Sequence, residues 1–403
     1  MLCVSAMMYY KSEQVIEEGL AKVIVPRFEY YRRPDGRLEP AWMPVFYNPQ
    51  AVLSRDLTVL FLRVVLGSRD YFFIDSLSGT GVRGIRIALE VGGRGILNDV
   101  DPRAYYYINK NIKLNKLAGR LEAFNSEANS LLNNLVVTGV VPDYVDIDPY
   151  GSPIPHIDSA LKSLGREAYL GVTATDTGPL SCTYPRKTLT RYWSKCIKLD
   201  FEKEFASRLL ISNIALRAAA LEINLKPLIT LVYKYYVRVF FQARRGAVEA
   251  YKTINNCTGY LWYCTNTIER GFTKNPEEVD FKCSDGSKPV VLGRLWICSI
   301  IDPEVASKMQ ASTGELPWIS SLSRGVLEIL AQESMINAPY YRLDKLCSIL
   351  KINMPSTIRV IERLREIGWI SSRTHMDPRG VKTNADYGEL VEVLRSMSQQ
   401  HAT

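Results

Sequence analysis

The sequence has 403 residues, 47% of them hydrophobic and 23% charged, which is ordinary for a globular protein with two or three cores. Lys and Arg exceed Asp and Glu by 50 − 42 = 8, a balance that favours polyanionic partners without establishing one. No apolar run approaches the ~18 residues of a membrane span, and Met1 to Met8 lack the basic region and cleavage site of a secretory signal. The eight cysteines form no regular framework and suit a reducing cytoplasm.

Alternating β-rich and helical stretches follow an N-terminal extension, residues 1–69, which is rich in Pro, Tyr and Arg. Within the extension, residues 49–66 have helical periodicity. The predicted strands that follow are Tyr71–Asp75, Gly95–Asp99, Leu121–Asn125, Tyr144–Asp148 and Ala168–Thr173. The predicted helices between them are Val82–Glu90, Pro102–Asn115, Asn129–Leu135 and Ile157–Leu164. This alternation predicts an α/β fold with a doubly wound parallel sheet.

The sequence changes character after Arg245. Before it, residues 207–221 read as an apolar helix, and residues 228–232 and 238–243 as a closing pair of strands. After it, residues 257–298 contain four cysteines with little periodicity, and helical patterns with a β-like run and a turn occupy the region beyond Trp318. We predict a second, α+β domain over residues 246–403 with a winged-helix-like part.

A glycine-rich loop follows the first predicted strand and opens a helix. Gly79, Gly81 and Gly84 fit the pattern G-x-G-x-x-G, which lets the backbone turn tightly and approach a ligand. Asp99, 20 residues after Gly79, ends the next strand, where a carboxylate can accept both ribose hydroxyls of an adenosine cofactor. The loop is introduced by Asp75, which would repel a pyrophosphate but suit a cationic sulfonium. The pattern therefore favours S-adenosylmethionine over NAD.

Asp148-Pro149-Tyr150-Gly151 ends the fourth predicted strand, on the edge where such sheets place ligands. Asp148 can accept an amino proton and stabilise a developing positive charge. Tyr150 offers a ring for stacking, and Pro149 fixes the neighbouring carbonyl. Methylation of an exocyclic amine on a nucleobase needs these groups, although a simple Asp-Pro-Gly turn has a similar composition.

Six motifs in order resemble the tRNA guanine-26 N2-dimethyltransferase family, from about residue 45 to residue 385. They are Val45–Pro49 with Ser54–Asp56, Asp75–Arg86, Leu97–Asp99, Asp146–Pro153, Gly171–Asp176, and Arg373–His375 with Gly380–Thr383. The resemblance implies a class I methyltransferase domain over residues 1–245 and a family-specific, tRNA-binding domain over residues 246–403. It implies transfer of one or two methyl groups from S-adenosylmethionine to N2 of guanine 26 in tRNA.

The resemblance also implies the roles of individual residues. Five would hold the cofactor together with Asp75 and Gly79: Arg55, Arg83, Asp99, Glu127 and Ala128. Asp148 would be catalytic, and Phe46 and Tyr150 would grip the flipped base beside Pro149. The family usually has Phe where this sequence has Tyr150, which adds a hydroxyl to the stacking ring. We expect tRNA as the partner, no membrane, no obligatory protein partner and a monomer.

Many family members carry paired C-x-x-C zinc ligands, whereas Cys264 and Cys283 each lack the second cysteine of such a pair. A structural zinc needs four ligands, mostly thiolates in close pairs. We therefore predict no bound metal, and Cys257, Cys264, Cys283 and Cys298 are left to form disulfides or stay as buried thiols. His375 follows the predicted wing strand, where it would contact RNA or have a local structural role.

Two alternatives to this function are open. One is an amino-methyltransferase acting on another tRNA base, on adenine N6 or on a protein. The other is a ligand-sensing regulator that binds nucleic acid through its winged-helix-like end. Basic residues beside aromatics, such as Arg186-Lys187 and Arg191-Tyr192-Trp193, are either solvated faces or an RNA-contacting surface.

Overall fold

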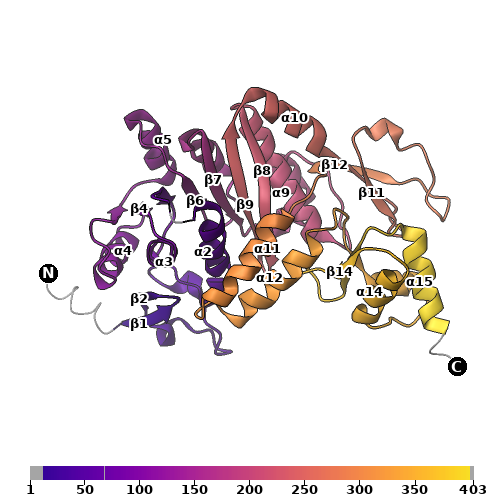
Figure 1. Ribbon diagram of the computed structural model, residues 1–403, viewed down its shortest axis with the longest axis horizontal. Coiled ribbons are helices and arrows are strands. Elements are labelled where there is room, and N and C mark those ends of the chain that lie inside the picture. Colours follow the sequence, from indigo (N-terminus) through magenta and orange to yellow (C-terminus); the bar gives the residue numbers. More distant parts are fainter. Residues whose placement is uncertain (1–11, 68, 400–403) are drawn as a thin grey trace. The chain divides into compact units, whose positions relative to one another are not determined.

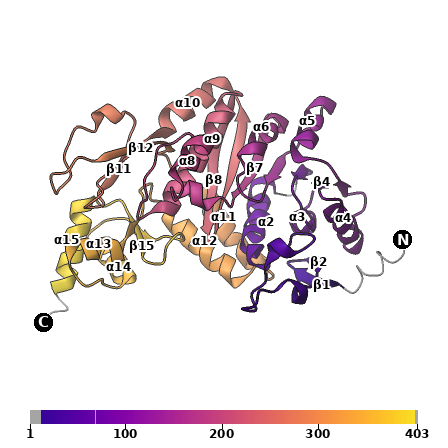
Figure 2. The ribbon, with the colours of Figure 1, turned by 180° about the vertical axis from the view of Figure 1, so that it is seen from behind.

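The computed structural model describes residues 12–67 and 69–399 (Figures 1 and 2). These residues form two compact units. Unit 1 runs to Pro149 and adds Pro155–Val172 and Ala311–Arg324, while unit 2 contains Tyr150–Ile154, Thr173–Gln310 and the chain from Gly325 onward. The predicted domain boundary at residue 245 stays a prediction. Met1 to Met8, for which we expect no secretory signal, lie outside the described residues.

Unit 1 contains a parallel sheet with the strand order β5-β4-β3-β6-β7. In chain order its strands are β3 (Phe72–Asp75), β4 (Arg94–Asn98), β5 (Leu121–Phe124), β6 (Tyr144–Ile147) and β7 (Glu167–Ala174). The helices between them are α3 (Val82–Glu90), α4 (Pro102–Leu114), α5 (Ala128–Thr138) and α6 (Ile154–Ser163). The order reverses between β3 and β6, as in doubly wound sheets. The predicted α/β fold is confirmed.

A hairpin of β1 (Glu13–Glu18) and β2 (Ala21–Pro26) precedes this sheet. The sequence did not predict it, because its partner is a helix almost 90 residues away. Asn111 of α4 exchanges hydrogen bonds with the backbone of Ile24 at 2.6 and 3.0 Å. Asn115 does the same with Lys22 at 2.9 and 2.7 Å. These side-chain amides satisfy the open edge of β2 in place of another strand.

A buried ion network joins the hairpin to helices α2 (Val52–Leu66) and α3. Arg86, which is fully buried, contacts Glu18 at 3.1 Å, Asp56 at 2.8 Å and Glu90 at 2.7 Å. Arg55 contacts the same Glu18 at 2.6 Å. Each buried charge therefore has a partner, which buried charges require.

The segment Ala311–Arg324 of unit 1 is attached to the same network. The Trp318 indole N–H donates to Glu90 at 2.8 Å, and the Ser323 hydroxyl donates to Asp56 at 2.7 Å. This segment contains η5 (Thr313–Glu315) and is flanked in the chain by α11 (Pro303–Ser312) and α12 (Ser321–Glu333). Three further 3₁₀ helices of unit 1 are η1 (Phe28–Tyr31), η2 (Pro40–Trp42) and η3 (Pro49–Ala51).

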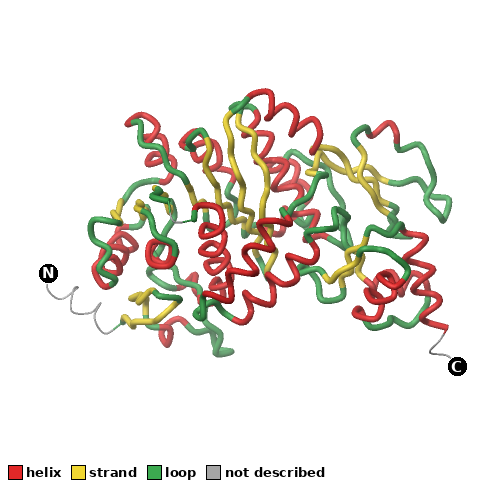
Figure 3. The backbone as a smooth tube through the Cα atoms, viewed as in Figure 1, coloured by secondary structure: helices red, strands yellow, loops and turns green. Residues whose placement is uncertain are grey.

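Unit 2 contains the long antiparallel pair β8 (Ile223–Tyr233) and β9 (Tyr236–Arg245), drawn in yellow in Figure 3. The predicted apolar helix before them is α9 (Glu202–Ala219), and two short helices precede it, α7 (Thr177–Leu180) and α8 (Pro185–Tyr192). The next sheet has the order β11-β10-β12. Its elements are α10 (Ala247–Cys257), β10 (Thr258–Tyr263), β11 (Arg270–Thr273), η4 (Pro276–Glu278) and β12 (Val290–Trp296).

The C-terminal part of unit 2 has a small sheet of order β13-β15-β14 with three helices. The elements are β13 (Tyr341–Arg342), α13 (Leu343–Leu350), α14 (Thr357–Glu366), β14 (Ser371–Arg373), β15 (Gly380–Thr383) and α15 (Tyr387–Gln399). Helices followed by a strand, a turn and a second strand agree with the predicted element order. The winged-helix assignment itself stays a prediction. No helix within residues 12–67 and 69–399 is long and apolar enough to cross a membrane.

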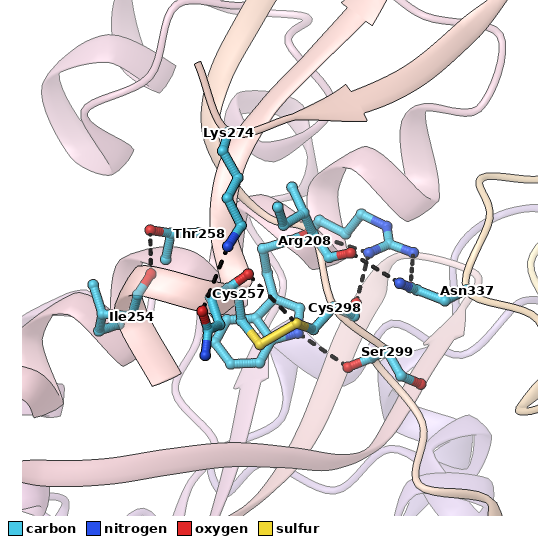
Figure 4. Close-up of a disulfide and its surroundings, with 11 residues drawn as sticks. Arg208, Ile254, Cys257, Thr258, Lys274, Cys298, Ser299 and Asn337 are labelled. Carbon is cyan, nitrogen blue, oxygen red and sulfur yellow. Dashed lines mark hydrogen bonds between the residues drawn. A yellow bond between two sulfur atoms is a disulfide. The ribbon is translucent and has the colours of Figure 1, made fainter. Parts of the chain in front are cut away.

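Six cysteines form three disulfides, Cys182–Cys196, Cys257–Cys298 and Cys264–Cys283. Of the two states left open for Cys257, Cys264, Cys283 and Cys298, the structure has the disulfides. The disulfide Cys182–Cys196 was not predicted and differs from the reduced state expected of a reducing cytoplasm. Figure 4 shows Cys257, at the end of α10, bonded to Cys298, two residues beyond β12. The pairing of β10 with β12 brings these two residues together across 41 positions of sequence, which sequence spacing does not reveal.

His375 and Lys382, both in the predicted C-terminal motif, are buried among the charges of unit 2. His375 Nε2 accepts the backbone N–H of Val232 at 3.0 Å, so the ring proton lies on Nδ1, which donates to Glu333. Lys382 lies 3.3 Å from Glu204. Of the two roles open for His375, the structure supports the local structural one.

Candidate functional site

Three predicted site carboxylates gather at the carboxyl ends of neighbouring parallel strands in unit 1. Asp75 is the last residue of β3, Asp99 directly follows β4, and Asp148 directly follows β6. Asn98, which sequence reasoning missed, ties the end of β4 to the segments after β3 and β5 by donating to the carbonyls of Ser76 at 3.0 Å and Ser126 at 2.9 Å. Ligands of doubly wound sheets bind along this edge.

The glycine-rich loop forms a close-packed cradle beside Asp99. Gly79 has a φ of +55°, and its N–H donates to Asp99 at 2.9 Å. A Cβ on Gly79 would come within 2.9 Å of the Phe46 carbonyl oxygen, and one on Gly84 within 1.9 Å of Leu97. The loop thus needs glycine both for its turn and for close packing, and it places the backbone of Phe46 against the cradle.

Asp99 and helix α5 provide further polar groups at this edge. The oxygens of Asp99 accept the N–H groups of Gly79 and Asp101, and a carboxylate has lone pairs left for two ribose hydroxyls. Burial raises the pKa of Asp99. Glu127 caps α5 by accepting the N–H groups of the second and third helical residues at 3.0 and 2.8 Å, and Ala128 begins the helix buried. The cradle and Asp99 therefore fit an adenosine ligand.

Arg83 holds Asp148 in place. Its guanidinium donates to Asp148 Oδ2, lies 3.4 Å from Asp146 and donates to the Thr58 hydroxyl at 2.8 Å. Burial alone would lower the pKa of Arg83, but Asp146 and Asp148 raise it, so the guanidinium stays charged. The side chain of Asp148 is 28% exposed, whereas that of Asp146 is fully buried. Asp148 is therefore the carboxylate of this pair that a substrate can reach.

The site carries more carboxylates than guanidinium groups. Asp75, which is buried, accepts the N–H of Gly84 at 3.2 Å and pairs in register with Asp146 on the next strand. Burial, followed by the charge of Asp146, raises the pKa of Asp75 to about 7. Three carboxylates around one arginine favour a cationic ligand and an amine that becomes positive during reaction.

Arg55, predicted to hold the cofactor, is bound to Glu18 and to the Asn48 carbonyl, 3.1 Å away. It therefore anchors the chain next to Phe46, whose side chain is 43% exposed. Tyr150 is 75% exposed and belongs to unit 2. The sandwich of a base between Phe46 and Tyr150, and the cofactor contacts predicted for the individual residues, stay predictions.

Sequence reasoning also missed Asp146 and Thr58, two further partners of Arg83. The spacing of Asp146 and Asp148 in Val-Asp-Ile-Asp contained a signal for Asp146, because residues two apart on a strand share a face. Thr58 carried no such signal. Its place beside Arg83 depends on the packing of α2 against α3.

The chain is similar over most of its length to one family of known proteins. A family model described as N2,N2-dimethylguanosine tRNA methyltransferase matches residues 19–395. The chain is 34% identical to a tRNA (guanine(26)-N(2))-dimethyltransferase of Sulfolobus acidocaldarius, covering 96% of this chain and 99% of the relative. It is 32% identical to a tRNA (guanine(26)-N(2)/guanine(27)-N(2))-dimethyltransferase of Aquifex aeolicus, with 95% and 96% covered.

Among solved structures, the chain resembles Trm1 from Pyrococcus horikoshii in complex with S-adenosyl-L-methionine. The TM-score is 0.81 at 28% sequence identity, and the match covers 94% of this chain and 99% of that one. These matches confirm the family resemblance that the six sequence motifs predicted, and with it the class I methyltransferase fold.

Proposed function

Because the chain belongs to the N2,N2-dimethylguanosine tRNA methyltransferase family, we propose that it transfers one or two methyl groups from S-adenosylmethionine to N2 of guanine 26 in tRNA. The observation that carries this proposal is the partly exposed carboxylate of Asp148, held by Arg83 at the edge of the sheet that also bears Asp99. The Asp148 carboxylate would also suit an adenine amine, and the family match is what favours guanine N2 over adenine and over a ligand-sensing regulator.

The proposed cofactor site is the cradle of unit 1. Asp99 would accept the ribose hydroxyls, Glu127 and Ala128 would flank the adenine, and Asp75 would favour the sulfonium charge. When bound, S-adenosylmethionine supplies an electrophilic methyl group. Arg55 and Arg83 would support this site mainly by holding neighbouring protein groups in place, since both guanidinium groups are paired with buried carboxylates.

The chemistry assigned to the protein is to activate a poor nucleophile. The lone pair of guanine N2 is delocalised into the ring, so Asp148 would accept one N2–H and Pro149 would fix a carbonyl toward the other. As N2 becomes positive, Asp148 stabilises the charge and then takes the proton. Extracting the guanine costs a few kcal/mol, and stacking between Phe46 and Tyr150 would return ~1–3 kcal/mol for this base.

A methylation assay tests this proposal. Purified protein is incubated with labelled S-adenosylmethionine and tRNA transcripts that have guanine 26, guanine 27 or neither replaced, and the nucleosides are then identified. We expect N2-methylguanosine and N2,N2-dimethylguanosine, both lost when guanine 26 is replaced. Label in adenosine, or in protein but not RNA, would contradict the proposal.

The acting form that we propose is a cytoplasmic monomer with tRNA as its macromolecular partner. Disulfides are compatible with this location in hyperthermophiles, whose intracellular proteins are disulfide-rich. Size-exclusion chromatography with light scattering, with and without tRNA, checks the monomer. A mass of twice 45.6 kDa for the free protein would contradict it.

A further inference from the structure

A short basic and aromatic segment of unit 2 is attached directly to the loop that bears Tyr150. The Gly151 N–H donates to the Thr175 hydroxyl at 2.7 Å, and the Thr175 N–H donates to the Gly151 carbonyl at 2.9 Å. Next along the loop, the Ser152 hydroxyl lies 3.0 Å from the hydroxyl of Tyr192, the last residue of α8. Helix α8 is therefore joined to the proposed base-binding loop.

The inner side of α8 is fixed by several bonds. The Tyr192 hydroxyl, which is buried, lies 2.7 and 2.8 Å from the two Asp176 oxygens. Because its single proton goes to this carboxylate, Ser152 must donate to Tyr192. Arg191 also donates to Asp176 at 2.8 Å. The disulfide Cys182–Cys196 closes the segment, and α8 contacts α7 and α9. Figure 2 shows α8 next to α9.

The outer side of this segment is strongly basic. Residues 182–196 contain four basic and no acidic residues, a formal charge of +4 against +8 for the whole chain. The basic residues are Arg186, Lys187, Arg191 and Lys195. All of them except Arg191 are exposed, and Arg191 is partly exposed. Phosphate groups bind to such a surface through charge.

Two exposed aromatic rings lie within the same segment. Tyr184 is 55% and Trp193 is 62% exposed, and each ring has a cation over it, Lys187 at 5.4 Å and Arg217 at 4.8 Å. Trp193 caps α8 in the left-handed conformation, with a φ of +54°, a position that Gly or Asn usually takes. Arg217 lies over the Trp193 ring, but most of the ring is exposed, and this exposed surface suits stacking on an unpaired nucleotide.

We propose that the segment 182–196, centred on α8, binds the tRNA strand next to the methylated guanine, with Arg186 and Lys187 on phosphates and Trp193 on a neighbouring base. The proposal rests on the proposed function for its choice of tRNA. It adds a recognition element that is separate from the cradle for the cofactor and from Asp148.

The test compares Arg186→Gln/Lys187→Gln with wild type in direct tRNA binding over a range of salt concentrations. We expect weaker binding at every concentration and a salt slope reduced by ~1.4–2, the value for two lost phosphate contacts. The KM for tRNA should rise about as much as Kd, while kcat and cofactor affinity stay unchanged. Trp193→Ala should weaken binding with an unchanged salt slope.

Lys252→Gln/Lys308→Gln is the matched control, because both lysines are exposed in unit 2 and paired with Glu249 and Glu304. Hydroxyl-radical footprints of bound tRNA should show lost protection beside guanine 26 for the α8 variants only. A wild-type Kd and salt slope in the Arg186/Lys187 variant, or an equal loss in the control, would overturn the proposal. If wild type binds tRNA but does not methylate it, the proposed function fails and the binding data still decide the role of α8.

Discussion

Glu18 allows a quantitative test of the buried ion network that supports the site. Burial would raise the pKa of its carboxyl, but Arg55 and Arg86 lower it to about 2 from 4.5. The difference corresponds to about 3 kcal/mol of stability at neutral pH. Because the folded pKa is the lower one, this contribution is complete above pH 4.5 and is lost as the pH falls through about 2.

The perturbation is Glu18→Gln, which keeps the shape of the side chain and removes its charge. Between pH 7 and pH 3 the contribution of Glu18 falls by about 2 kcal/mol. The difference in free energy of unfolding between wild type and Glu18→Gln should therefore shrink by that amount. Urea unfolding followed by circular dichroism at several pH values measures it.

Glu17→Gln is the control, since Glu17 is an exposed neighbour, 3.7 Å from Lys22. An exposed ion pair contributes little to stability, so the free energy of unfolding of Glu17→Gln should equal that of wild type at every pH. If the difference in free energy of unfolding between wild type and Glu18→Gln stays constant, or grows as the pH falls, the lowered pKa of Glu18 is refuted. The argument that its ion network stabilises the fold is then refuted as well.

Four other predictions concern the site and the disulfides. Asp148→Ala should lower kcat by about 10²–10⁴-fold with an unchanged Kd for S-adenosylmethionine in calorimetry, and near-normal turnover would exclude its proposed role. Asp99→Ala should weaken S-adenosylmethionine binding by about 10–100-fold, whereas an unchanged Kd would contradict the ribose contact. Asp75→Asn should be more stable than wild type at pH 8 but not at pH 4, because the raised pKa of Asp75 makes its ionised form destabilising; equal melting curves at pH 8 would contradict this. Cys264→Ser/Cys283→Ser should lose about 3 kcal/mol, as expected for a closed loop of 19 residues, and unchanged unfolding in urea would count against the disulfide.

The sequence predicted the parallel sheet because each strand and helix carries its own local pattern. The helix Val82–Glu90 was placed to the residue, and each predicted strand of this sheet ends within a residue of the observed one. The hairpin of β1 and β2 was missed because its stability comes from amides of α4. No periodicity within residues 13–26 contains that information.

The candidate site also combines residues that local sequence predicts with contacts that depend on long-range packing. Gly79, Asp99 and Asp148 follow directly from the order of strands and loops, so the sequence placed them correctly at the carboxyl edge. The partners of Arg55 and Arg83 depend on which helices pack together, and the residues that they contact lie between 7 and 65 positions away. A family motif therefore identifies these arginines but does not say what their guanidinium groups touch.

The acidity of the guanine amine sets the order of events in the proposed mechanism. Before methyl transfer the amine is neutral and holds its protons tightly, so a carboxylate is poorly suited to remove one at that stage. Asp148 is well suited to accept an N2–H bond, and to take the proton once N2 has become positive and strongly acidic. Proton loss therefore follows methyl transfer, and the carboxylates around Arg83 stabilise the cationic amine in between.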